Sequence, residues 1–233
     1  MSPERSGVAD LLIIVPSRGR PGNIAALHDA WKATTAGAAA LLVAADEDDP
    51  TLEDYRYLCQ SRGVELVVGP RLRMCPTLSA VAVERAPHHF AVGFFGDDHR
   101  PRTRGWDRRY LDELHDLGTG IVYGDDLLQH DRLPTQVAMT SDIVQALGWM
   151  APPGLLHLWV DNVWKDLGQA IGRLRYLPDV VVEHMHYLNG KAAEDDRYRE
   201  VNDSAAAEAD RLAYAAWLEH DMPGDVEKLK ALL

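Results

Sequence analysis

The sequence predicts an α/β protein with a mostly parallel central sheet, and two patterns in its first half carry this prediction. Four short, mostly apolar runs have the length and composition of buried strands, at residues 11–15, 40–45, 64–68 and 90–95. Segments with helical spacing separate them. Strands that are apolar throughout are typical of parallel sheets, and strands that alternate with helices form βαβ units.

The segment after the first run has clear turn and helix signals. Residues 16–22 are dense in Pro, Gly and Ser, which predicts a turn. Asn23 can then cap a helix that presents Ile24, Leu27 and Trp31 at helical spacing. A strand, a turn and a helix in this order make up the first βα unit of the sheet.

The second half of the chain is less regular. We expect helices at 105–117 and 160–171, and short strands at 121–123 and 136–139. Residues 174–177 and 180–183 are expected to form two edge strands, because Pro178 interrupts them and has no backbone donor.

The end of the chain, from about residue 192, is rich in Ala and in charged residues. A helical segment is expected there, with Leu212, Trp217 and Leu218 on one face.

Composition and charge narrow the class of protein. The chain has 233 residues, of which 46% are hydrophobic, enough for a sizeable core without disulfides. Cys59 and Cys75 have no paired spacing, so we expect reduced thiols in a cytoplasmic protein. The polar first ten residues and the five-residue apolar run after them argue against a signal peptide and a membrane span, and predict a soluble protein. The net charge of −12 argues against general nucleic-acid binding.

The predicted topology also places the binding site. In open α/β sheets ligands bind outside the carboxyl ends of the strands. The polar residues that follow Val15, Ala45 and Phe95 should therefore converge on one rim of the sheet.

Asp97 and Asp98 form an acidic pair directly after the fourth strand. Two adjacent carboxylates at such a place are costly unless they are neutralised, and Mg²⁺ or Mn²⁺ would neutralise them while keeping positions open for phosphate oxygens. The alternative is a turn in which the pair caps the next segment.

A basic cluster beside a metal site suits a small polyanion such as a diphosphate, although a solvated helix face is the alternative for its last two members. The cluster follows the acidic pair and consists of Arg100, Arg102, Arg104, Arg108 and Arg109.

The segments IIVPSRGRP, after the first strand, and FFGDDHRPRTRGW, after the fourth, resemble the family-two-like GT-A glycosyltransferases of the nucleotide-diphospho-sugar transferase superfamily. The resemblance covers roughly residues 11–190. It implies a Rossmann-like GT-A fold, with helices flanking the sheet and a smaller, mixed region on the acceptor side. It also implies a single domain over 1–233, with a nucleotide-sugar-binding half at about 8–100, an acceptor-binding half at about 101–190 and a C-terminal helical segment at about 191–233.

The resemblance implies roles for residues after the first two strands. Pro16, Ser17 and Arg18 would line the base and ribose, with Arg18 or Arg20 near the diphosphate. Asp46, which ends the second strand, would contact the base or ribose, or else form a simple strand-end turn.

In the acidic triplet of the family, Asp98 takes the position that contacts the metal. Asp97 would serve the ribose or support the metal ligands. Gly96 stands where the first acid is expected, which is a departure from the pattern. The loop at 71–73 falls where such enzymes place a loop near the nucleotide, although we favour a solvent-exposed loop without that role.

Asp161 matches the acid that faces the acceptor in these enzymes. In inverting members this acid is the general base that deprotonates the acceptor hydroxyl. Val160 stands where a further acid is common in the family, which is a second departure from its pattern. Trp159 and Trp164 could supply aromatic surface for a sugar. The alternatives are a helix cap for the aspartate and core positions for the two tryptophans.

His184 and His186 follow the last apolar run and would point the same way if the strand continues. Many GT-A enzymes add a late histidine to the metal, so the resemblance makes both candidate ligands. Imidazole beside carboxylate shifts the expected metal from Mg²⁺ toward Mn²⁺.

Together these features predict a metal-dependent glycosyltransferase that moves a sugar from a nucleotide-diphosphate sugar to a hydroxyl acceptor. The acceptor could be a small molecule, a glycan, a protein or a modified DNA base. The alternatives are a nucleotidyltransferase that forms a nucleotide sugar, and a non-catalytic relative that binds one.

Overall fold

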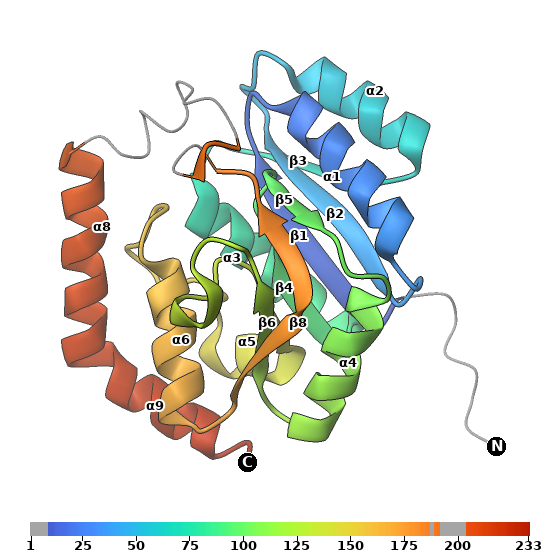
Figure 1. The fold of residues 1–233 in the computed structure, drawn as a ribbon. Helices are drawn as coiled ribbons and strands as arrows, with labels where there is room; N and C mark the ends of the chain where they lie inside the picture. Colours follow the sequence, from blue (N-terminus) through green and yellow to red (C-terminus); the bar gives the residue numbers. More distant parts are fainter. Residues whose placement is uncertain (1–8, 187–188, 192–203) are drawn as a thin grey trace.

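The fold, taken from a computed structural model, is described here for residues 9–186, 189–191 and 204–233. Its centre is a curved sheet of eight strands in the order β3-β2-β1-β4-β7-β6-β8-β5, with helices on both faces (Figure 1). The predicted α/β class is therefore confirmed.

The strands are β1 (Leu11–Ser17), β2 (Ala39–Asp46), β3 (Glu65–Gly69), β4 (Ala91–Phe94), β5 (His99–Pro101), β6 (Ile121–Asp125), β7 (Val137–Thr140) and β8 (Leu174–His184). The helices are α1 (Pro21–Thr34), α2 (Leu52–Arg62), α3 (Met74–Arg85), α4 (Trp106–Leu117), α5 (Ser141–Leu147), α6 (Val160–Ala170), α8 (Ser204–Ala216) and α9 (Met222–Lys230).

The first half of the sheet is wholly parallel. β1 pairs with β2 on one side and with β4 on the other, and β2 pairs with β3. These are the four strands that the apolar runs predicted, with ends shifted by one or two residues. Because the strands are parallel, their carboxyl ends lie along one edge, which brings the segments after β1, β2 and β4 together.

The second half of the sheet is mixed. β7 runs antiparallel to both β4 and β6, β8 is parallel to β6, and β5 is antiparallel to β8. The pairing of β5 with β8 is decisive for the site, because it sets His99 opposite His184.

The expected pair of edge strands at 174–177 and 180–183 is wrong. Both belong to one continuous strand, β8, which lies between β6 and β5 rather than at an edge. The register shifts after Gly124, so that Leu177 and Val181 pair with consecutive residues of β6 and Pro178 lies in the bulge between them. Gly124 allows this close approach, because a Cβ atom there would lie 2.2 Å from the carbonyl oxygen of Val180.

Side chains of β1 alternate between two cores. Leu11, Ile13 and Val15 pack with α1, α2 and α4 on one face of the sheet. Leu12 and Ile14 pack with α3, α5, α6 and α9 on the other face. Both faces of the central strand are therefore buried, which explains why the first apolar run has no polar alternation.

The C-terminal segment is helical, as expected, but its buried face differs from the prediction. Trp217 is buried, whereas Leu212 and Leu218 are exposed. Leu212 and Trp217 are five residues apart, which is not a multiple of the helical period, so an α-helix places them on different faces. A π-helical turn at Trp217–Asp221 then joins α8 to α9. None of the helices in the described part of the chain has the length and apolar composition of a membrane span.

Candidate active site

A cavity of about 460 Å³ lies at the carboxyl ends of β1, β2 and β4, where the sequence predicted that polar residues converge. Its wall also includes parts of the β6–β7 loop, the segment before α6, and α8. Ten of the residues with a predicted role lie on this wall: Pro16, Ser17, Arg18, Arg20, Asp46, Asp97, Asp98, Asp161, His184 and His186. Their individual roles stay predictions.

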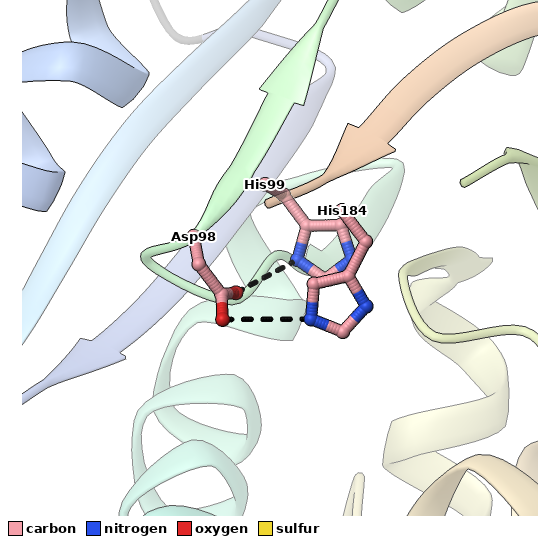
Figure 2. A group of neighbouring side chains, drawn as sticks. All are labelled: Asp98, His99 and His184. Carbon is pink, nitrogen blue, oxygen red and sulfur yellow. Dashed lines mark ion pairs between the residues drawn. The ribbon is translucent and has the colours of Figure 1, made fainter. Parts of the chain in front are cut away.

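Asp98, His99 and His184 form a cluster of metal-ligand groups on this wall, with one ligand atom of each within 4.8 Å of the others (Figure 2). Nε2 of His184 lies 3.4 Å from Oδ2 of Asp98, and Nδ1 of His99 lies 3.7 Å from Oδ1. A carboxylate with imidazole nitrogens fits a divalent transition metal such as Mn²⁺ better than Mg²⁺, which prefers oxygen ligands.

His99 has a defined tautomer. Its Nδ1 accepts a hydrogen bond of 2.9 Å from the N–H of Gly96, which places the ring proton on Nε2, 3.4 Å from the hydroxyl of Thr135. Burial, assisted by the neighbouring His184, lowers the pKa of His99 to about 3, so its ring is neutral. A metal at Nδ1 would have to displace the Gly96 N–H, so Asp98 and His184 are the better-placed ligands.

His184 lies between two carboxylates. Burial lowers its pKa, but Asp126 and Asp98 outweigh burial and raise the pKa to about 9. Its buried Nδ1 lies 3.9 Å from Oδ2 of Asp126 and has no hydrogen-bond partner among the described residues. A histidine that binds metal through one nitrogen commonly directs the other at a carboxylate, so the pair fits a metal site.

Asp126 is itself held firmly. Its Oδ2 accepts a bond of 2.8 Å from Thr135, and its Oδ1 accepts bonds from three successive N–H groups, at residues 128–130. Burial would raise the pKa of Asp126, but these bonds and His184 lower it, so the carboxylate is ionised.

Gly96 is explained by packing. A Cβ atom at this position would lie 2.7 Å from Oδ1 of Asp98 and 2.8 Å from Nδ1 of His99. The aspartate and the buried imidazole therefore fill the space that a side chain at position 96 would need. The missing first acid of the triplet thus follows from the insertion of His99 into the site.

Asp97 belongs to a hydrogen-bond network at the end of β1. Its Oδ2 accepts a bond of 2.6 Å from Ser17, and its Oδ1 accepts one of 3.2 Å from Asn23. Arg20 lies 3.5 Å from the same Oδ1. Burial and the adjacent Asp98 raise the pKa of Asp97, whereas Arg20 and the two donors oppose that shift.

Arg18 pairs with the end of β2. Its guanidinium donates to Asp46 at 3.0 Å and also pairs with Asp48. Burial lowers the pKa of Arg18, but these two carboxylates outweigh burial and raise it. The pair places an arginine and an aspartate side by side on the cavity wall, where the resemblance put the base and ribose.

The basic cluster after the acidic pair does not line the cavity, so its expected role with a diphosphate is not supported. Arg100 is buried and donates to two backbone carbonyls. Arg102 pairs with Glu183, and Arg109 pairs with Asp179, each at 2.7 Å. The arginines on the cavity wall are instead Arg18, Arg20, Arg71 and Arg73. The loop at 71–73 is thus exposed, as expected, and still reaches the site.

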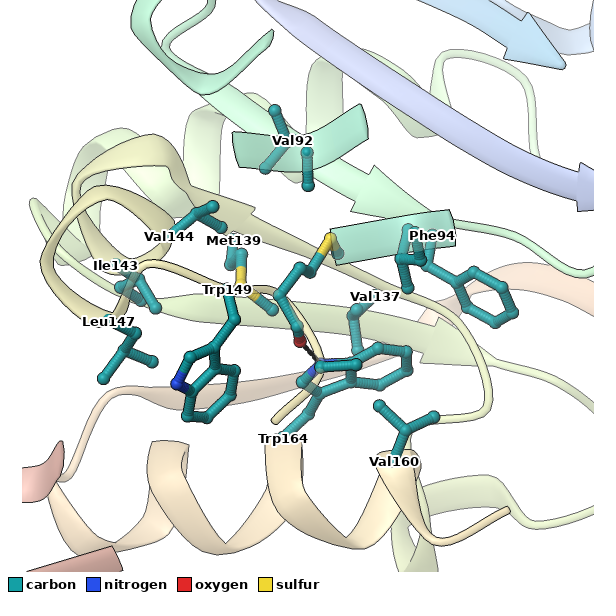
Figure 3. Close-up of a cluster of buried hydrophobic side chains, with 14 of the residues drawn as sticks. Val92, Phe94, Val137, Met139, Ile143, Val144, Leu147, Trp149, Val160 and Trp164 are labelled. Carbon is teal, nitrogen blue, oxygen red and sulfur yellow. Dashed lines mark hydrogen bonds between the residues drawn. The ribbon is translucent and has the colours of Figure 1, made fainter. Parts of the chain in front are cut away.

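Asp161 lies in the first turn of α6. Burial raises its pKa to about 7, against the opposing effect of His184. Val160 and Trp164 of the same helix point into the core, and Nε1 of Trp164 donates to the carbonyl of Met150 (Figure 3). Trp164 therefore offers no surface to a sugar, whereas Trp159 lines the cavity.

His186 also lines the cavity but stands beside the cluster rather than in it. Its ring meets that of His184 edge to face, with 4.9 Å between the centroids. Burial and His184 lower the pKa of His186, so it is neutral at pH 7.

Strained backbone is concentrated around the cavity. Among the described residues, positive φ outside glycine occurs at Arg73, Leu127, His130 and Trp159. Arg73 and Trp159 line the cavity, and the other two flank the lining residues of the β6–β7 loop. Such conformations cost free energy and gather at functional sites.

Sequence reasoning gave no role to His99 or Asp126. The signal for His99 was its position directly after the acidic pair. Asp126 also belongs to an Asp-Asp pair, but the chain has several such pairs, and nothing in the sequence distinguishes this one.

Comparison with solved structures shows that the chain has the GT-A fold. The mannosyltransferase PcManGT from Pyrobaculum calidifontis, in complex with GDP-Man and Mn²⁺, is similar with a TM-score of 0.62 at 14% identity, over 99% of this chain and 76% of that one. TarS from S. aureus is similar with a TM-score of 0.59 at 11% identity, over 93% of this chain and 45% of that one.

A TarS fragment, residues 1–349, in complex with UDP-GlcNAc gives a TM-score of 0.53 at 10% identity, over 93% of this chain and 75% of the fragment. At these identities the likeness establishes a shared fold. No protein-family model and no curated protein sequence matches the chain.

Proposed function

We propose that this protein is a metal-dependent glycosyltransferase that transfers a sugar from a nucleotide-diphosphate sugar to a hydroxyl acceptor. The observation that carries the proposal is that one cavity joins three kinds of group: the Asp98–His184 ligand pair, four arginines, and Asp161. The solved structures with GDP-Man and Mn²⁺ and with UDP-GlcNAc support this choice of donor class.

Asp98 and His184 would hold the metal, with Asp126 behind the imidazole. A divalent cation there supplies charge that stabilises the leaving diphosphate. Arg18, Arg20, Arg71 and Arg73 line the same cavity, and their positive charge would neutralise phosphate oxygens.

Asp161 would accept the proton of the acceptor hydroxyl as that oxygen attacks the anomeric carbon. A general base works best when its pKa is close to the working pH, and burial gives Asp161 a pKa of about 7. This value distinguishes Asp161 from an ordinary helix-capping aspartate, which would keep an acidic pKa.

The test is release of nucleoside diphosphate from UDP-GlcNAc and from GDP-mannose, with Mn²⁺ and with EDTA. Water serves as the acceptor in this assay. We expect Mn²⁺-dependent release that Asp98→Asn abolishes. Asp179→Asn is the matched control, because Asp179 is an exposed acid of β8, the strand of His184, that pairs with Arg109.

The outcome separates the alternatives. Pyrophosphate formed from a nucleoside triphosphate and a sugar phosphate, without hydrolysis of either nucleotide sugar, would favour a nucleotidyltransferase. Binding of UDP or GDP without any turnover would favour a non-catalytic relative.

A further inference from the structure

Asp210, on α8, is a buried acid that the proposed chemistry leaves without a role. It is 2% exposed. Its carboxylate accepts bonds from three consecutive N–H groups, those of Leu156 at 2.7 Å, His157 at 2.9 Å and Leu158 at 2.7 Å. These donors lie just before α6, separated from it by Trp159, and they line the cavity together with Asp210. Charge-assisted bonds to three successive N–H groups fix the backbone that carries them.

The carbonyl side of the same segment is held by α3. The N–H of Cys75 donates to the carbonyl of Leu156 at 3.0 Å, and its thiol donates to the carbonyl of His157 at 3.6 Å. The segment is thus held between the first turn of α3 and α8, which runs beside α6 (Figure 1). Loss of Asp210 would release one side of it.

The next residue, Trp159, transmits this constraint to α6. Its backbone has φ 72, a conformation that is rare for an aromatic residue and needs support from its surroundings. Its ring stacks on Tyr214 of α8, with 5.2 Å between centroids and 19° between planes. The hydroxyl of Tyr214 donates to Asp166 on α6. Because α6 begins at the residue after Trp159, the direction of its first turn depends on this support.

We propose that Asp210 is a positioning residue: by holding the backbone of 156–158, it sets the orientation in which Asp161 faces the cavity. The proposal rests on the proposed function, in which Asp161 takes the acceptor proton. Asp210 acts through the three N–H groups and takes no part in proton transfer.

The test is Asp210→Asn, which keeps the shape but replaces one acceptor oxygen with a donor. For Mn²⁺-dependent hydrolysis of the active nucleotide sugar we expect kcat to fall on the order of 10- to 100-fold, with the donor KM nearly unchanged. Hydrogen exchange at the amides of 156–158 should become faster.

The matched control is Asp225→Asn. Asp225 is also a buried acid of the C-terminal segment, and it accepts bonds from Trp217 and Lys228. It lies outside the cavity, so this variant should keep the wild-type kcat even if it is less stable. Tyr214→Leu provides a second variant, which removes the stacking on Trp159 and should lower kcat in the same way.

Equal kcat losses for Asp210→Asn and Asp225→Asn, or a rise in donor KM that accounts for the whole loss, would overturn the proposal. If Asp210→Asn does not fold, an unchanged kcat in Tyr214→Leu would overturn it. A wild-type protein that hydrolyses neither nucleotide sugar would instead defeat the proposed function. In that case the hydrogen-exchange measurement still tests the positioning role: if the amides of 156–158 exchange as slowly in Asp210→Asn as in the wild type, the proposal is overturned.

Discussion

Nδ1 of His184 lies 3.9 Å from Oδ2 of Asp126, while Nε2 of the same ring lies 3.4 Å from Asp98. The imidazole therefore has one nitrogen for the candidate metal and the other for a fixed carboxylate. Without metal this arrangement stabilises a protonated His184, and a bound cation would replace that proton.

Asp126→Asn should weaken Mn²⁺ binding about 10- to 100-fold, because the imidazole loses the carboxylate that orients it and increases its basicity. Titration calorimetry with Mn²⁺ measures this directly. Asp125→Asn is the control, since the carboxylate of Asp125 is hydrogen-bonded to His130 and to the N–H of Leu127 instead. Equal losses in the two variants would contradict a specific role for Asp126.

Gly96→Ala should weaken Mn²⁺ binding about tenfold or more, because the added Cβ must push Asp98 or the buried His99 out of place. The same calorimetric titration applies. Gly224→Ala, on α9, adds a methyl group into open space and should bind Mn²⁺ like the wild type. Unchanged affinity in Gly96→Ala would show that the cluster does not hold the metal.

The pH profile of hydrolysis should follow the ionisation of Asp161. A general base must be ionised, and its pKa is about 7, so kcat should rise with pH up to and through neutrality. Asp161→Asn should remove this dependence and lower kcat about 100-fold or more while UDP still binds. Asp142, at the same place in the first turn of α5, gives the matched control. A similar loss of kcat in Asp142→Asn would indicate that any aspartate in the first turn of a helix has this effect, and would contradict the role of Asp161 as the base.

Ionisation of Asp161, which activity requires, should lower the stability of the metal-free protein. The folded-state pKa of Asp161 is raised above its ordinary value of 3.8, so its ionisation costs folding free energy as pH rises through about 7. Asp161→Asn should therefore raise Tm relative to wild type at pH 8 but not at pH 4. Thermal unfolding at the two pH values measures this difference. An identical Tm shift at both would mean that the carboxyl has an ordinary pKa.

Arg73→Ala should weaken UDP or GDP binding about tenfold, because one charge-assisted hydrogen bond to a phosphate is lost from the cavity wall. Fluorescence or calorimetric titration with the nucleoside diphosphate is the measurement. Arg102→Ala is the control, since Arg102 pairs with Glu183 away from the cavity. A stronger effect of Arg102→Ala would restore the cluster after the acidic pair as the diphosphate site.

The parallel half of the sheet could be predicted from the sequence, because its strands are buried on both faces and each strand therefore appears as an apolar run. Leu11 to Val15 are apolar without alternation, which is the requirement of a central strand with helices on both sides. The prediction for β8 was wrong, because a proline usually interrupts a strand. Only the pairing with β6 shows the bulge after Gly124 that accommodates Pro178. The expected C-terminal face was wrong because Leu212, Trp217 and Leu218 do not share one face at α-helical spacing, and of the three only Trp217 is buried.

For the site, the sequence by itself determined which residues follow the strand ends, and the topology of parallel strands then required Asp46, Asp97 and Asp98 to converge. The tertiary structure alone decided the partners. His99 meets His184 only because β5 pairs with β8, and Asp126 reaches His184 only through the fold of the β6–β7 loop. Contacts between residues far apart in the chain depend on packing geometry, which residue type and local spacing do not specify.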